Sequence, residues 1–432
     1  MSLLLPIEAP KHWQRRRIQA VFRMYGGGTP AKENLKFWGG EIPWVSPKDM
    51  KTSFVSSTED TITEQAVASS ATRIVPEGCL LIVVRSGILK HSIPTAIASK
   101  AVSLNQDIKA LVPIEPVDTR YIRYMLTGHE KLLLTVWRSL GATVESLDSE
   151  RIKQSTIPLP SLSTQKAIAD YLDDKTAAID ALIEKKRKLL DLLAEERAAL
   201  INQAVTKGLD PTVPMKDSGI PWIGEIPAHW EVQRIASIST KITNGYVGPT
   251  RDLFVGEGIP YLQSLHIKGN TIIFSPAYHV PESWSLSKRK SILTTDDVLV
   301  VQTGDIGQVT VVPPEWEGSN CHALIIITTN KIQMLGSFLS WTLNSQYGYH
   351  SLKSIQTGAL HPHLNCTLVR ELRIPQPCIE EQTKISNHLD KYKNSFAKKR
   401  EVVDQQINRL QEYRQALIAA AVTGQLDIEA AA

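Results

Sequence analysis

The amino-acid sequence contains one long segment that is written twice. ALINQAVTKGLD begins at Ala199 and ALIAAAVTGQLD begins at Ala416, so the two stretches lie 217 residues apart (416 − 199). The same offset aligns further residues along the chain without a change of phase: Pro10 with Pro227, Trp13 with Trp230, Arg17 with Arg234, Ile42 with Ile259, Ile157 with Ile374, Gln165 with Gln382 and Arg197 with Arg414. A chain repeated at this scale is expected to fold as two copies of one architecture.

Each repeat begins with a segment that is typical of a compact mixed domain. Residues 1–161 and 211–378 are rich in Gly, Pro and Trp. Their apolar runs, among them CLLIVV from Cys79 and ALIIIT from Ala323, are short and are broken by turn signals such as PEGC, TTDD and TNGY. Such runs indicate strands, and short helices are expected near residues 121–126 and 338–343. We therefore predict an α+β fold class with two mixed α/β domains.

Each repeat ends with a segment of a different kind, at 162–210 and 379–432. No Gly or Pro occurs between 164 and 206 or between 381 and 423, and apolar residues recur at every seventh position. In the first copy the polar Lys186 occupies one of these heptad positions. Leu182 and Leu189 lie three residues after the heptad positions 179 and 186. The predicted coiled-coil core residues are Leu172, Ile179, Leu193, Leu200, Leu389, Phe396, Val403, Leu410 and Leu417. A heptad pattern sustained over this length predicts a coiled coil.

The connectivity predicts that the two helices pair antiparallel. Each helix spans about 60 Å at 1.5 Å per residue, and the second globular domain connects the end of the first helix to the start of the second. In an antiparallel pair these two ends are neighbours, whereas a parallel pair would force the domain to bridge the full helix length. We therefore expect two globular domains at opposite ends of a helical rod, related by an internal pseudo-two-fold axis.

Two related domains held at a fixed separation suit duplex DNA as a partner. A protein with a two-fold axis presents two reading heads to half-sites along the duplex, and the spacing of the heads sets the spacing of the half-sites. Because the two domains share a scaffold but differ in surface sequence, the expected target is bipartite and asymmetric, with an unread spacer.

Composition excludes several other classes of protein. Hydrophobic residues make up 42% and charged residues 21% of the 432 positions, which are values of a globular protein. The longest apolar runs fall far short of the roughly 18 residues of a membrane helix, and the N-terminus lacks the pattern of a signal peptide, so a cytoplasmic location is expected. The four cysteines show no spacing typical of zinc sites or disulfide frameworks, so no metal is expected. The net charge of +4 leans only weakly toward a polyanionic partner.

Catalytic motifs are missing from the sequence. It contains no GxxxxGK[ST] loop, no HExxH, no GxSxG, and no Asp/Asn-Pro-Pro-aromatic tetrapeptide of the kind that amino-methyltransferases use. We therefore expect a chain without a catalytic site of its own.

Over its whole length the sequence resembles the specificity subunits of type I restriction-modification systems, the HsdS family. The resemblance rests on IPLPSLSTQKAIADYL and IPQPCIEEQTKISNHL where the helices start, on AVTKGLD and AVTGQLD where they end, and on KDSGIPWIGEIPAHWEV, GGGTP and GGEIPWVSPKDM in the domains. The first helix start departs from the family pattern: it has Thr164-Gln165 where Glu381-Gln382 keeps the usual Glu-Gln pair. We expect this change to be tolerated.

The resemblance implies a division of labour. This chain would supply two target recognition domains that read double-stranded DNA. Two methyltransferase (modification) subunits would dock on its helices and methylate adenine N6 with S-adenosylmethionine, so that this chain would bind no cofactor itself. Translocase and nuclease (restriction) subunits would join the complex for restriction.

Candidate DNA-binding residues follow from side chains that suit phosphates or base edges. Arg and Lys neutralise phosphates, Arg forks to guanine, and Asn or Gln forks to adenine. The candidates in the first repeat are Arg15, Arg16, Lys48, Arg85, Ser86, Lys90, Arg138 and Thr143. The candidates in the second repeat are Gln302, Thr303, Gln308, Lys353, His361 and His363. Each of them has the alternative of being a solvated loop residue.

Other features have structural alternatives too. Trp13 and Trp230 recur in both repeats while the charge around them changes, so we interpret them as packing residues. The basic runs 185–188 and 398–400 lie on the helices, either as solvated faces or as part of a partner-binding face. Two alternatives for the whole chain also stand: a coiled-coil scaffold joining two protein-binding modules, or a self-sufficient DNA nuclease or methyltransferase.

Overall fold

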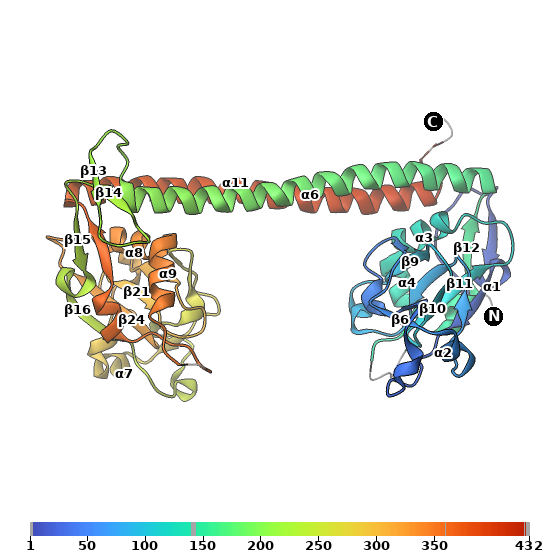
Figure 1. Ribbon diagram of the computed structural model, residues 1–432, viewed down its shortest axis with the longest axis horizontal. Coiled ribbons are helices and arrows are strands. Elements are labelled where there is room, and N and C mark those ends of the chain that lie inside the picture. Colours follow the sequence, from blue (N-terminus) through green and yellow to red (C-terminus); the bar gives the residue numbers. More distant parts are fainter. Residues whose placement is uncertain (1–2, 140–143, 359, 427, 429–432) are drawn as a thin grey trace. The chain divides into compact units, whose positions relative to one another are not determined.

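The computed structural model describes residues 3–139, 144–358, 360–426 and 428 (Figure 1). The chain divides into two compact units. The first unit consists of residues 1–186 together with 405–432, and the second unit consists of residues 187–404. The C-terminal end of the chain therefore belongs to the same unit as the N-terminal domain.

The first unit is built on two packed sheets and a smaller one. The five-stranded sheet has the order β3 (Phe22–Gly26), β11 (Ile108–Pro113), β8 (Leu80–Val83), β9 (Thr95–Ala98) and β5 (Phe54–Val55). The four-stranded sheet has the order β6 (Asp60–Ile62), β4 (Trp38–Val45), β10 (Val102–Leu104) and β7 (Ile74–Val75). A three-stranded sheet joins β1 (Leu3–Leu4), β12 (Ser155–Leu159) and β2 (Gln14–Arg17).

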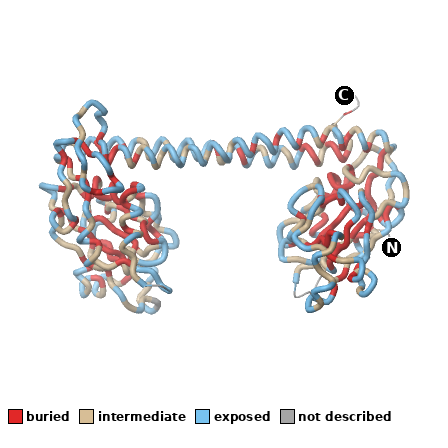
Figure 2. The backbone as a smooth tube through the Cα atoms, in the orientation of Figure 1, coloured by how far each residue is buried: buried red, intermediate tan, exposed pale blue. Residues whose placement is uncertain are grey.

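Helices cover the sheets of the first unit. They are α1 (Ile18–Val21), α2 (Glu64–Ala68), α3 (Thr119–Gly128), α4 (Glu130–Trp137) and α5 (Ser149–Gln154). Residues of β4, β8, β9, β10 and β11 share one buried apolar cluster. Every residue of β8 is buried, because this central strand is covered on both faces. Figure 2 shows that the buried stretches of the chain gather inside the globular domains.

The second unit repeats this plan with shorter sheets. Its four-stranded sheet has the order β16 (Ser239–Asn244), β24 (Leu324–Thr329), β21 (Val298–Val301) and β22 (Val309–Val311). A three-stranded sheet joins β20 (His279–Val280), β17 (Ile259–Leu262) and β23 (Asn320–Cys321). Two-stranded pairs are β13 (Met215–Asp217) with β14 (Glu225–Pro227), β15 (Glu231–Arg234) with β25 (Arg373–Gln376), and β18 (Ile267–Lys268) with β19 (Thr271–Ile272).

The central strand of the second unit separates two cores. Val298 and Val300 of β21 pack into a cluster with Phe338 and Trp341 of α8 (Gly336–Asn344). The alternate residues of β21 pack into a second cluster with residues of β17 and β23. The remaining helices are α7 (Glu282–Ser287), α9 (Gln346–Ser354) and α10 (Cys366–Glu371). The apolar run VLVV is buried on both sides because each face meets its own core.

The duplication in the sequence is matched element by element. At the same offset of 217 residues (371 − 154), α5 corresponds to α10, and β2 (Gln14–Arg17) corresponds to β15 (Glu231–Arg234). The two long helices, α6 (Leu162–Lys207) and α11 (Ile379–Val422), begin at equivalent positions. The predicted fold class, two mixed α/β domains with long paired helices, is confirmed.

The long helices α6 and α11 pass through both units and run antiparallel in each. In the first unit, Asp180 lies 2.9 Å from Arg414, and Nζ of Lys186 donates to Oε1 of Gln406 (2.7 Å). In the second unit, the guanidinium of Arg197 lies over the ring of Phe396, 5.7 Å from its centroid. Residue numbers rise along one helix as they fall along the other, as the connectivity argument requires.

The predicted coiled-coil core residues are all at least half-buried, and Leu389 and Leu200 pack with the core cluster of the second unit, so their place between the helices stays a prediction. Leu172, Ile179, Leu389, Val403 and Leu417 are buried, and the other four predicted core residues, Leu193, Leu200, Phe396 and Leu410, are half-buried. Four residues after Leu172 and Ile179, Thr176 and Ile183 are buried as well, and the Thr176 hydroxyl lies 3.1 Å from that of Tyr124 in α3. Leu182 and Leu189, which follow their positions by three residues, are 42% and 41% exposed and do not belong to the seam.

Each unit is completed by the helix end of the other repeat. In the second unit, α6 ends before Gly208, which has a left-handed φ of 77°. Gly208 lies against the side chains of Trp230 and Pro227. In the first unit, a Cβ on Gly424 (φ 68°) would lie 2.7 Å from Cγ of Pro10 and 2.9 Å from Cζ2 of Trp13. Trp230 is fully buried and Trp13 is half-buried, so both pack against a helix end.

A buried glutamine ties each long helix to its own globular domain. In the first unit, Oε1 of Gln165 accepts from the backbone N–H of Asp118 (3.0 Å), and Nε2 donates to the carbonyl of Pro160 (2.9 Å). In the second unit, Oε1 of Gln382 accepts from the N–H of Leu335 (2.8 Å), and Nε2 donates to the carbonyl of Pro377 (2.8 Å). The same two bonds therefore recur at equivalent residues.

The neighbour of each glutamine differs between the repeats. Glu381 accepts from Nε1 of Trp230 and lies 3.0 Å from Nε2 of His229. At the equivalent place Thr164 lies 2.9 Å from the Ser161 hydroxyl, where it takes part in the first turn of α6. The glutamine contacts are kept without the glutamate, which agrees with the expectation that the change at Thr164 is tolerated.

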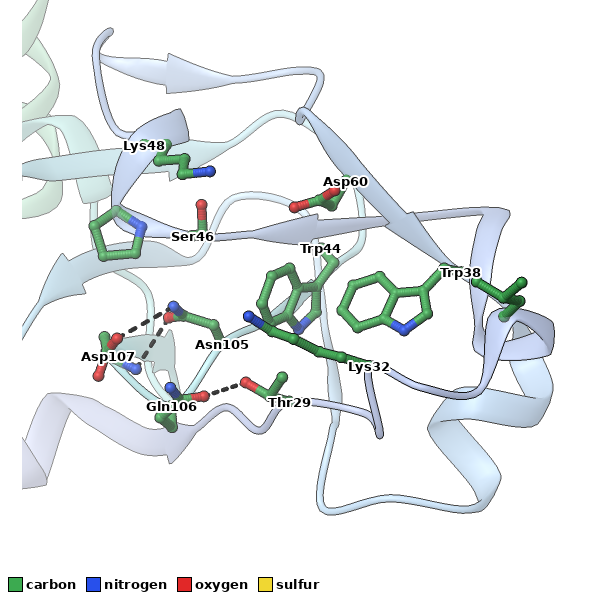
Figure 3. A pocket seen from close by; sticks show the side chains of 12 residues that line it. Thr29, Lys32, Trp38, Trp44, Ser46, Lys48, Asp60, Asn105, Gln106 and Asp107 are labelled. Atoms are coloured by element: carbon green, nitrogen blue, oxygen red, sulfur yellow. Dashed lines mark hydrogen bonds between the residues drawn. The ribbon is translucent and has the colours of Figure 1, made fainter.

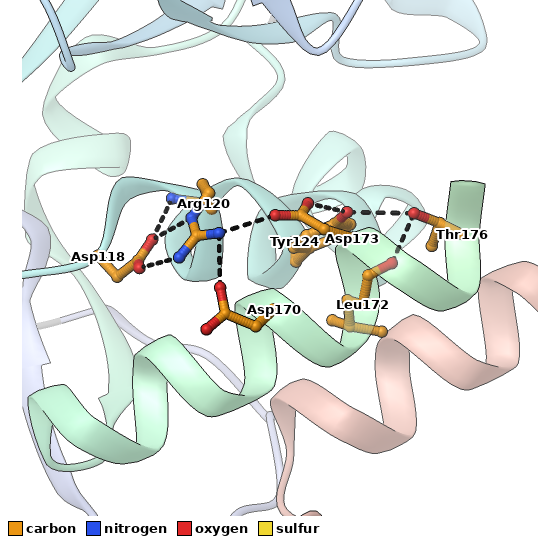
Figure 4. Close-up of polar contacts among 7 residues, drawn as sticks. All are labelled: Asp118, Arg120, Tyr124, Asp170, Leu172, Asp173 and Thr176. Carbon is orange, nitrogen blue, oxygen red and sulfur yellow. Dashed lines mark hydrogen bonds and ion pairs between the residues drawn. The ribbon is translucent and has the colours of Figure 1, made fainter. Parts of the chain in front are cut away.

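Carboxylates on the long helices make a second connection (Figure 4). Arg120 in α3 donates to Asp170 (2.8 Å) and Asp173 (2.9 Å) of α6 as well as to Asp118, whose bonds raise the pKa of Arg120 further above its usual value. The Tyr124 hydroxyl donates to Asp173 (2.7 Å). In the second unit, Nε1 of Trp341 donates to Asp390 (3.1 Å), the counterpart of Asp173. Each domain is thus fixed on its helix at two places.

We expect Gln165→Met and Gln382→Met, each made singly, to lower the free energy of unfolding by on the order of 2–4 kcal/mol, because each leaves a buried carbonyl and a part-buried N–H without partners. Urea unfolding of the full chain followed by tryptophan fluorescence measures the change. Gln406→Met is the matched control, since Gln406 is exposed, and its expected effect is within about 0.5 kcal/mol. Equal effects at all three positions would contradict the account.

The stability of the second unit is expected to fall in acid because of His266. This fully buried ring accepts from the N–H of Gln263 at Nδ1 (2.9 Å), and its Nε2 lies 2.9 Å from the carbonyl of Pro276. Burial lowers its pKa from the ordinary 6.5, partly opposed by the bond to Pro276. The unfolded chain therefore takes up the proton first, and the stability that is complete above pH 6.5 is lost as the pH falls below it.

His266→Gln is expected to flatten the fall in unfolding free energy between about pH 7.5 and about pH 5. The fall should not vanish, because burial also lowers the pKa of His129 and His322. Urea unfolding across this pH range measures it, with His388→Gln on the exposed side of α11 as the control. A variant profile as steep as that of the control would show that His266 does not carry the effect.

Candidate nucleic-acid interface

In the first unit, the loop that leaves β8 lies beside the segment that precedes α5. The N–H of Leu147 donates to the carbonyl of Val84 (2.8 Å), and the N–H of Ser86 donates to the carbonyl of Glu145 (3.0 Å). Arg85 and Ser146 form an isolated bridge, as do Arg138 and Leu147. Two segments some 60 residues apart in the chain are thereby joined into one surface, which we call the first loop pair (residues 84–90, 138–139 and 144–147).

The first loop pair carries four of the predicted DNA-binding residues. Arg85 and Arg138 lie at its bridges, Ser86 bonds the carbonyl of Glu145, and Lys90 ends the short 3-10 helix η3 (Gly87–Lys90) that follows Ser86. Thr143 lies outside the described residues. The structure thus brings together side chains from two segments that the sequence had offered separately.

An open hollow of about 970 Å³ adjoins this surface through Asp107 (Figure 3). Nε of Arg85 donates to Oδ1 of Asp107 (2.6 Å), and Asp107 lines the hollow beside Asn105 and Gln106. Lys48, a predicted candidate, lines the hollow too. The others that line it include Thr29, Lys32, Trp38, Trp44, Ser46 and Asp60.

Sequence reasoning missed several of these residues. Asn105 and Gln106 sit in the turn between β10 and β11, and Lys32 follows the GGGTP segment. Polar residues at a turn between two apolar runs were the available signal. Trp38 and Trp44 form a T-shaped pair with ring centroids 5.1 Å apart, and both indole N–H groups donate to backbone carbonyls, which fixes the aromatic wall.

The second unit has an equivalent second loop pair, residues 302–304, 355–358 and 360–364. The N–H of Leu364 donates to the carbonyl of Gln302 (3.0 Å), and Thr303 forms a bridge with His363. Thr357 and His363 exchange two backbone bonds of 3.0 and 2.9 Å. Gln302, Thr303 and His363 thus gather in one place, and His361 lies two residues before His363, with its carbonyl 3.3 Å from Nδ1 of that ring.

Two candidates of the second unit lie elsewhere. Oε1 of Gln308 accepts from the N–H of Gly269 (3.1 Å), and Gln308 lines a separate hollow with Lys268 and Tyr349. Nζ of Lys353 lies 5.5 Å from the centroid of the Tyr349 ring. The structure therefore places Gln308 and Lys353 near Tyr349, a residue that the sequence reasoning did not single out.

Arg15 and Arg16 are also set apart from the first loop pair. They lie on β2 opposite Pro158 and Ile157 of β12, the strand that leads into α6. Nη2 of Arg15 donates to the carbonyl of Ile7 (2.6 Å), and Arg16 pairs with Glu115 (2.9 Å). These contacts secure the strand beneath the helix start, and the role in phosphate binding stays a prediction.

Carboxylates accompany the cations of the first unit. Arg85 pairs with Asp107 (2.6 Å), Arg138 with Glu145 (3.2 Å) and Lys48 with Glu59 (3.6 Å). These pairs are partly exposed, and such pairs contribute only about 0–1 kcal/mol each. A phosphate or a base edge can therefore replace the carboxylate at little cost.

Within the described ranges, no three His, Cys, Asp or Glu side chains gather as metal ligands would. Among the helices that the structure describes, none has an apolar stretch long enough to cross a bilayer. The surface features of both units are instead polar loops, amides and cations of the kind that contact nucleic acids.

Comparison with known proteins gives a consistent set of relatives. Residues 10–191 and 227–409 each match the family model of the type I restriction modification DNA specificity domain. The specificity subunit of the type I restriction enzyme EcoR124I/EcoR124II of Escherichia coli is 38% identical over 178 residues, which cover 41% of this chain and 44% of that protein. The MjaIX specificity subunit of Methanocaldococcus jannaschii is 26% identical over 437 residues, which cover 97% of this chain and 95% of that one.

Solved structures share the fold. A chain from a structural study of complex assembly and conformational transition of the type I R-M system aligns with a TM-score of 0.69 at 15% identity, covering 98% of this chain and 100% of that one. The HsdS subunit from Thermoanaerobacter tengcongensis aligns with a TM-score of 0.51 at 16% identity, covering 98% and 99% of the two chains.

Glu145→Gln is expected to strengthen the binding of duplex DNA about two- to fivefold at low salt, because it frees Arg138 and removes a negative charge from the first loop pair. Fluorescence anisotropy of a labelled duplex measures the affinity. Glu371→Gln is the matched control, since it breaks the Glu371 pair with Arg234 (3.0 Å) outside both loop pairs. The same gain in both variants would refute the assignment of this surface.

Proposed function

The chain belongs to the family of type I restriction-modification DNA specificity proteins, and on that basis we propose that each of its domains reads one half of a bipartite, asymmetric DNA target. As a member of this family it is a non-catalytic, DNA-binding specificity subunit, and catalysis takes place in partner subunits. The proposal concerns how the reading is divided between the two units.

The observation that carries the proposal is a shared scaffold with different side chains at equivalent loops. Arg85 and Ser86 of the first loop pair correspond to Gln302 and Thr303 of the second, and both sets follow the central strand of their sheet. An arginine fork suits guanine, whereas a glutamine amide suits adenine. Two equivalent surfaces with different hydrogen-bonding groups support two different half-sites.

The long helices support a proposed role in spacing and assembly. α6 has 46 residues and α11 has 44, which correspond to about 65–70 Å of helix at 1.5 Å per residue. In the proposed function this length separates the two half-sites by an unread spacer. In the second unit Leu189 and Leu192 of α6 and Val402 of α11 are exposed, as are Leu182 and Tyr413 in the first, so apolar side chains face outward from the helix pair.

These outward apolar residues suit the docking of other subunits. We propose that two methyltransferase subunits bind along the helices and that restriction and translocation subunits join them, in the cytoplasm where the DNA lies. S-adenosylmethionine would be bound by the methyltransferase and would supply the methyl group for adenine N6. The contribution of this chain is to place the target adenines by holding the two half-sites.

Mapping of N6-methyladenine by single-molecule sequencing tests the function. Cells that express this chain with a cognate methyltransferase subunit are expected to methylate one bipartite asymmetric motif, and cells that lack this chain are expected to leave it unmethylated. An unchanged methylation pattern without the chain would overturn the proposed function.

The same mapping tests the division of labour. Arg85→Ala is expected to relax one half of the motif by removing discrimination on the order of 1–3 kcal/mol at one position, and Gln302→Ala is expected to relax only the other half. Arg234→Ala should leave both halves intact. A variant that alters both halves together would contradict the assignment of one half-site to each unit.

A further inference from the structure

Three consecutive cations stand in the second unit with no assigned role. Lys288, Arg289 and Lys290 follow α7, and Arg289 and Lys290 are exposed. Among the residues that the structure describes, no ion pair engages any of the three. They differ in this from Arg85 and Arg138 of the first loop pair, which pair with Asp107 and Glu145. Three adjacent cations without a carboxylate concentrate positive potential at one place on the surface, which favours the binding of an anion.

The run lines one wall of a groove of about 590 Å³. Residues 286–291 form this wall and residues 244–247, which follow β16, form the other; we call the feature the basic groove. Val247 and Leu286 on its rim are 66% and 49% exposed. Cations beside exposed apolar rims suit a phosphodiester, whose charged phosphates alternate with apolar sugar faces.

Both walls of the basic groove are held firmly. The N–H of Tyr246 donates to the carbonyl of Cys321 (2.9 Å), and its carbonyl accepts from the N–H of Ala323 (2.9 Å). Its ring packs edge-on against Trp284, with centroids 5.1 Å apart, and Nζ of Lys288 lies 5.5 Å from the Tyr246 centroid. The opposite wall is closed by the bond from the N–H of Ser291 to the carbonyl of Lys288 (3.0 Å). The cations therefore stand on a fixed frame.

The basic groove is continuous with the second loop pair. Asn244 in the groove accepts at Oδ1 from Sγ of Cys366 (3.0 Å), and Cys366 lies two residues after Leu364, which binds the carbonyl of Gln302. Burial raises the pKa of the Cys366 thiol, and the charge of Lys290 opposes this rise, so Lys290 faces the same junction. The basic groove thus adjoins the segment that holds Gln302 and Thr303, so one duplex can contact both surfaces.

The first unit keeps a related contact at the equivalent place. The segment after α2 carries Arg73, whose guanidinium lies 4.9 Å from the centroid of Tyr25 near the end of β3. In both units a cation from the segment after the short helix thus lies on a tyrosine at the end of the edge strand. The first unit has the single cation Arg73 in this segment, whereas the second unit has three consecutive cations.

We propose that the basic groove binds the phosphodiester backbone of the DNA half-site that the second unit reads. The proposal rests on the proposed DNA-reading function and adds to it the path of one strand. The groove binds the phosphates and positions the duplex on the second unit but does not distinguish bases. Base discrimination is the role of the second loop pair. The affinity of the second unit is accordingly the more sensitive to salt.

The test uses the full-length chain with the substitutions K288Q, R289Q and K290Q together. Fluorescence anisotropy of a labelled duplex that carries the methylated motif gives the affinity from about 50 mM to about 200 mM salt. Losing three phosphate contacts is expected to reduce the slope of log affinity against log salt by about 2.7, so that the affinity of the variant falls roughly 40-fold less over this range. The methylated motif is expected to stay the same.

The matched control removes the same charge from the same unit with K207Q, K216Q and K331Q. Lys216 lies on the β13–β14 hairpin, on the far side of the unit from α7 (Figure 1), Lys207 ends α6, and all three are exposed. This variant is expected to change the slope by less than about 1. Equal melting temperatures of both variants and the parent chain show that the surface substitutions leave the fold intact.

Three results would overturn the proposal. A salt slope unchanged by the groove substitutions would show that no DNA backbone lies in the groove. If the same variant also lost binding of the methyltransferase subunit, the groove would be a site for that subunit. A changed motif would make the groove a base-reading site. Absence of duplex binding by the parent chain at low salt would instead refute the proposed function itself, and the groove proposal with it.

Discussion

A buried glutamine in the first turns of each long helix ties that helix to the globular domain that precedes it. The side chain of Gln165 joins the carbonyl that follows β12 to the backbone N–H of the residue before α3. The side chain of Gln382 joins the carbonyl that follows β25 to the backbone N–H of the residue before α8. Such bonds add little net free energy when formed but are costly to break, because both partners are buried. The angle between each domain and its own helix is therefore fixed.

The path from the first loop pair to the long helix α6 is short. In the first unit the loop that carries Arg138 leads through α5 and β12 directly into α6, and Nε1 of Trp137 donates to the Ser155 hydroxyl at the start of β12 (2.8 Å). The loops can change their side chains while this connection is kept, because surface loops tolerate substitution better than the buried strands beside them. The two units illustrate the point: one presents arginines beside carboxylates, and the other presents amides and unpaired cations.

Much of this arrangement could be predicted from the sequence, because duplication and heptad spacing are one-dimensional patterns. The offset of the repeat locates α10 from α5 and the start of α11 from the start of α6. The pairing of Arg85 with Asp107 could not be predicted, since it depends on β8 and β11 being neighbours in the sheet. The basic groove was missed for the same reason: α7 and the end of β16 are some 40 residues apart. Leu182 and Leu189 are exposed because a seam alternates steps of three and four, which the seven-residue repeat alone does not determine.

The central claim is that one scaffold, used twice, gives two independent readers. It is tested most directly by replacing residues 14–159 with residues 231–376, which run from the start of β15 to the end of β25 as the replaced segment runs from the start of β2 to the end of β12. N6-methyladenine mapping in cells that carry this chain with the methyltransferase subunit is the measurement. The account predicts a palindromic motif made of two inverted copies of the half-site read by the second unit. Retention of the original asymmetric motif would contradict it.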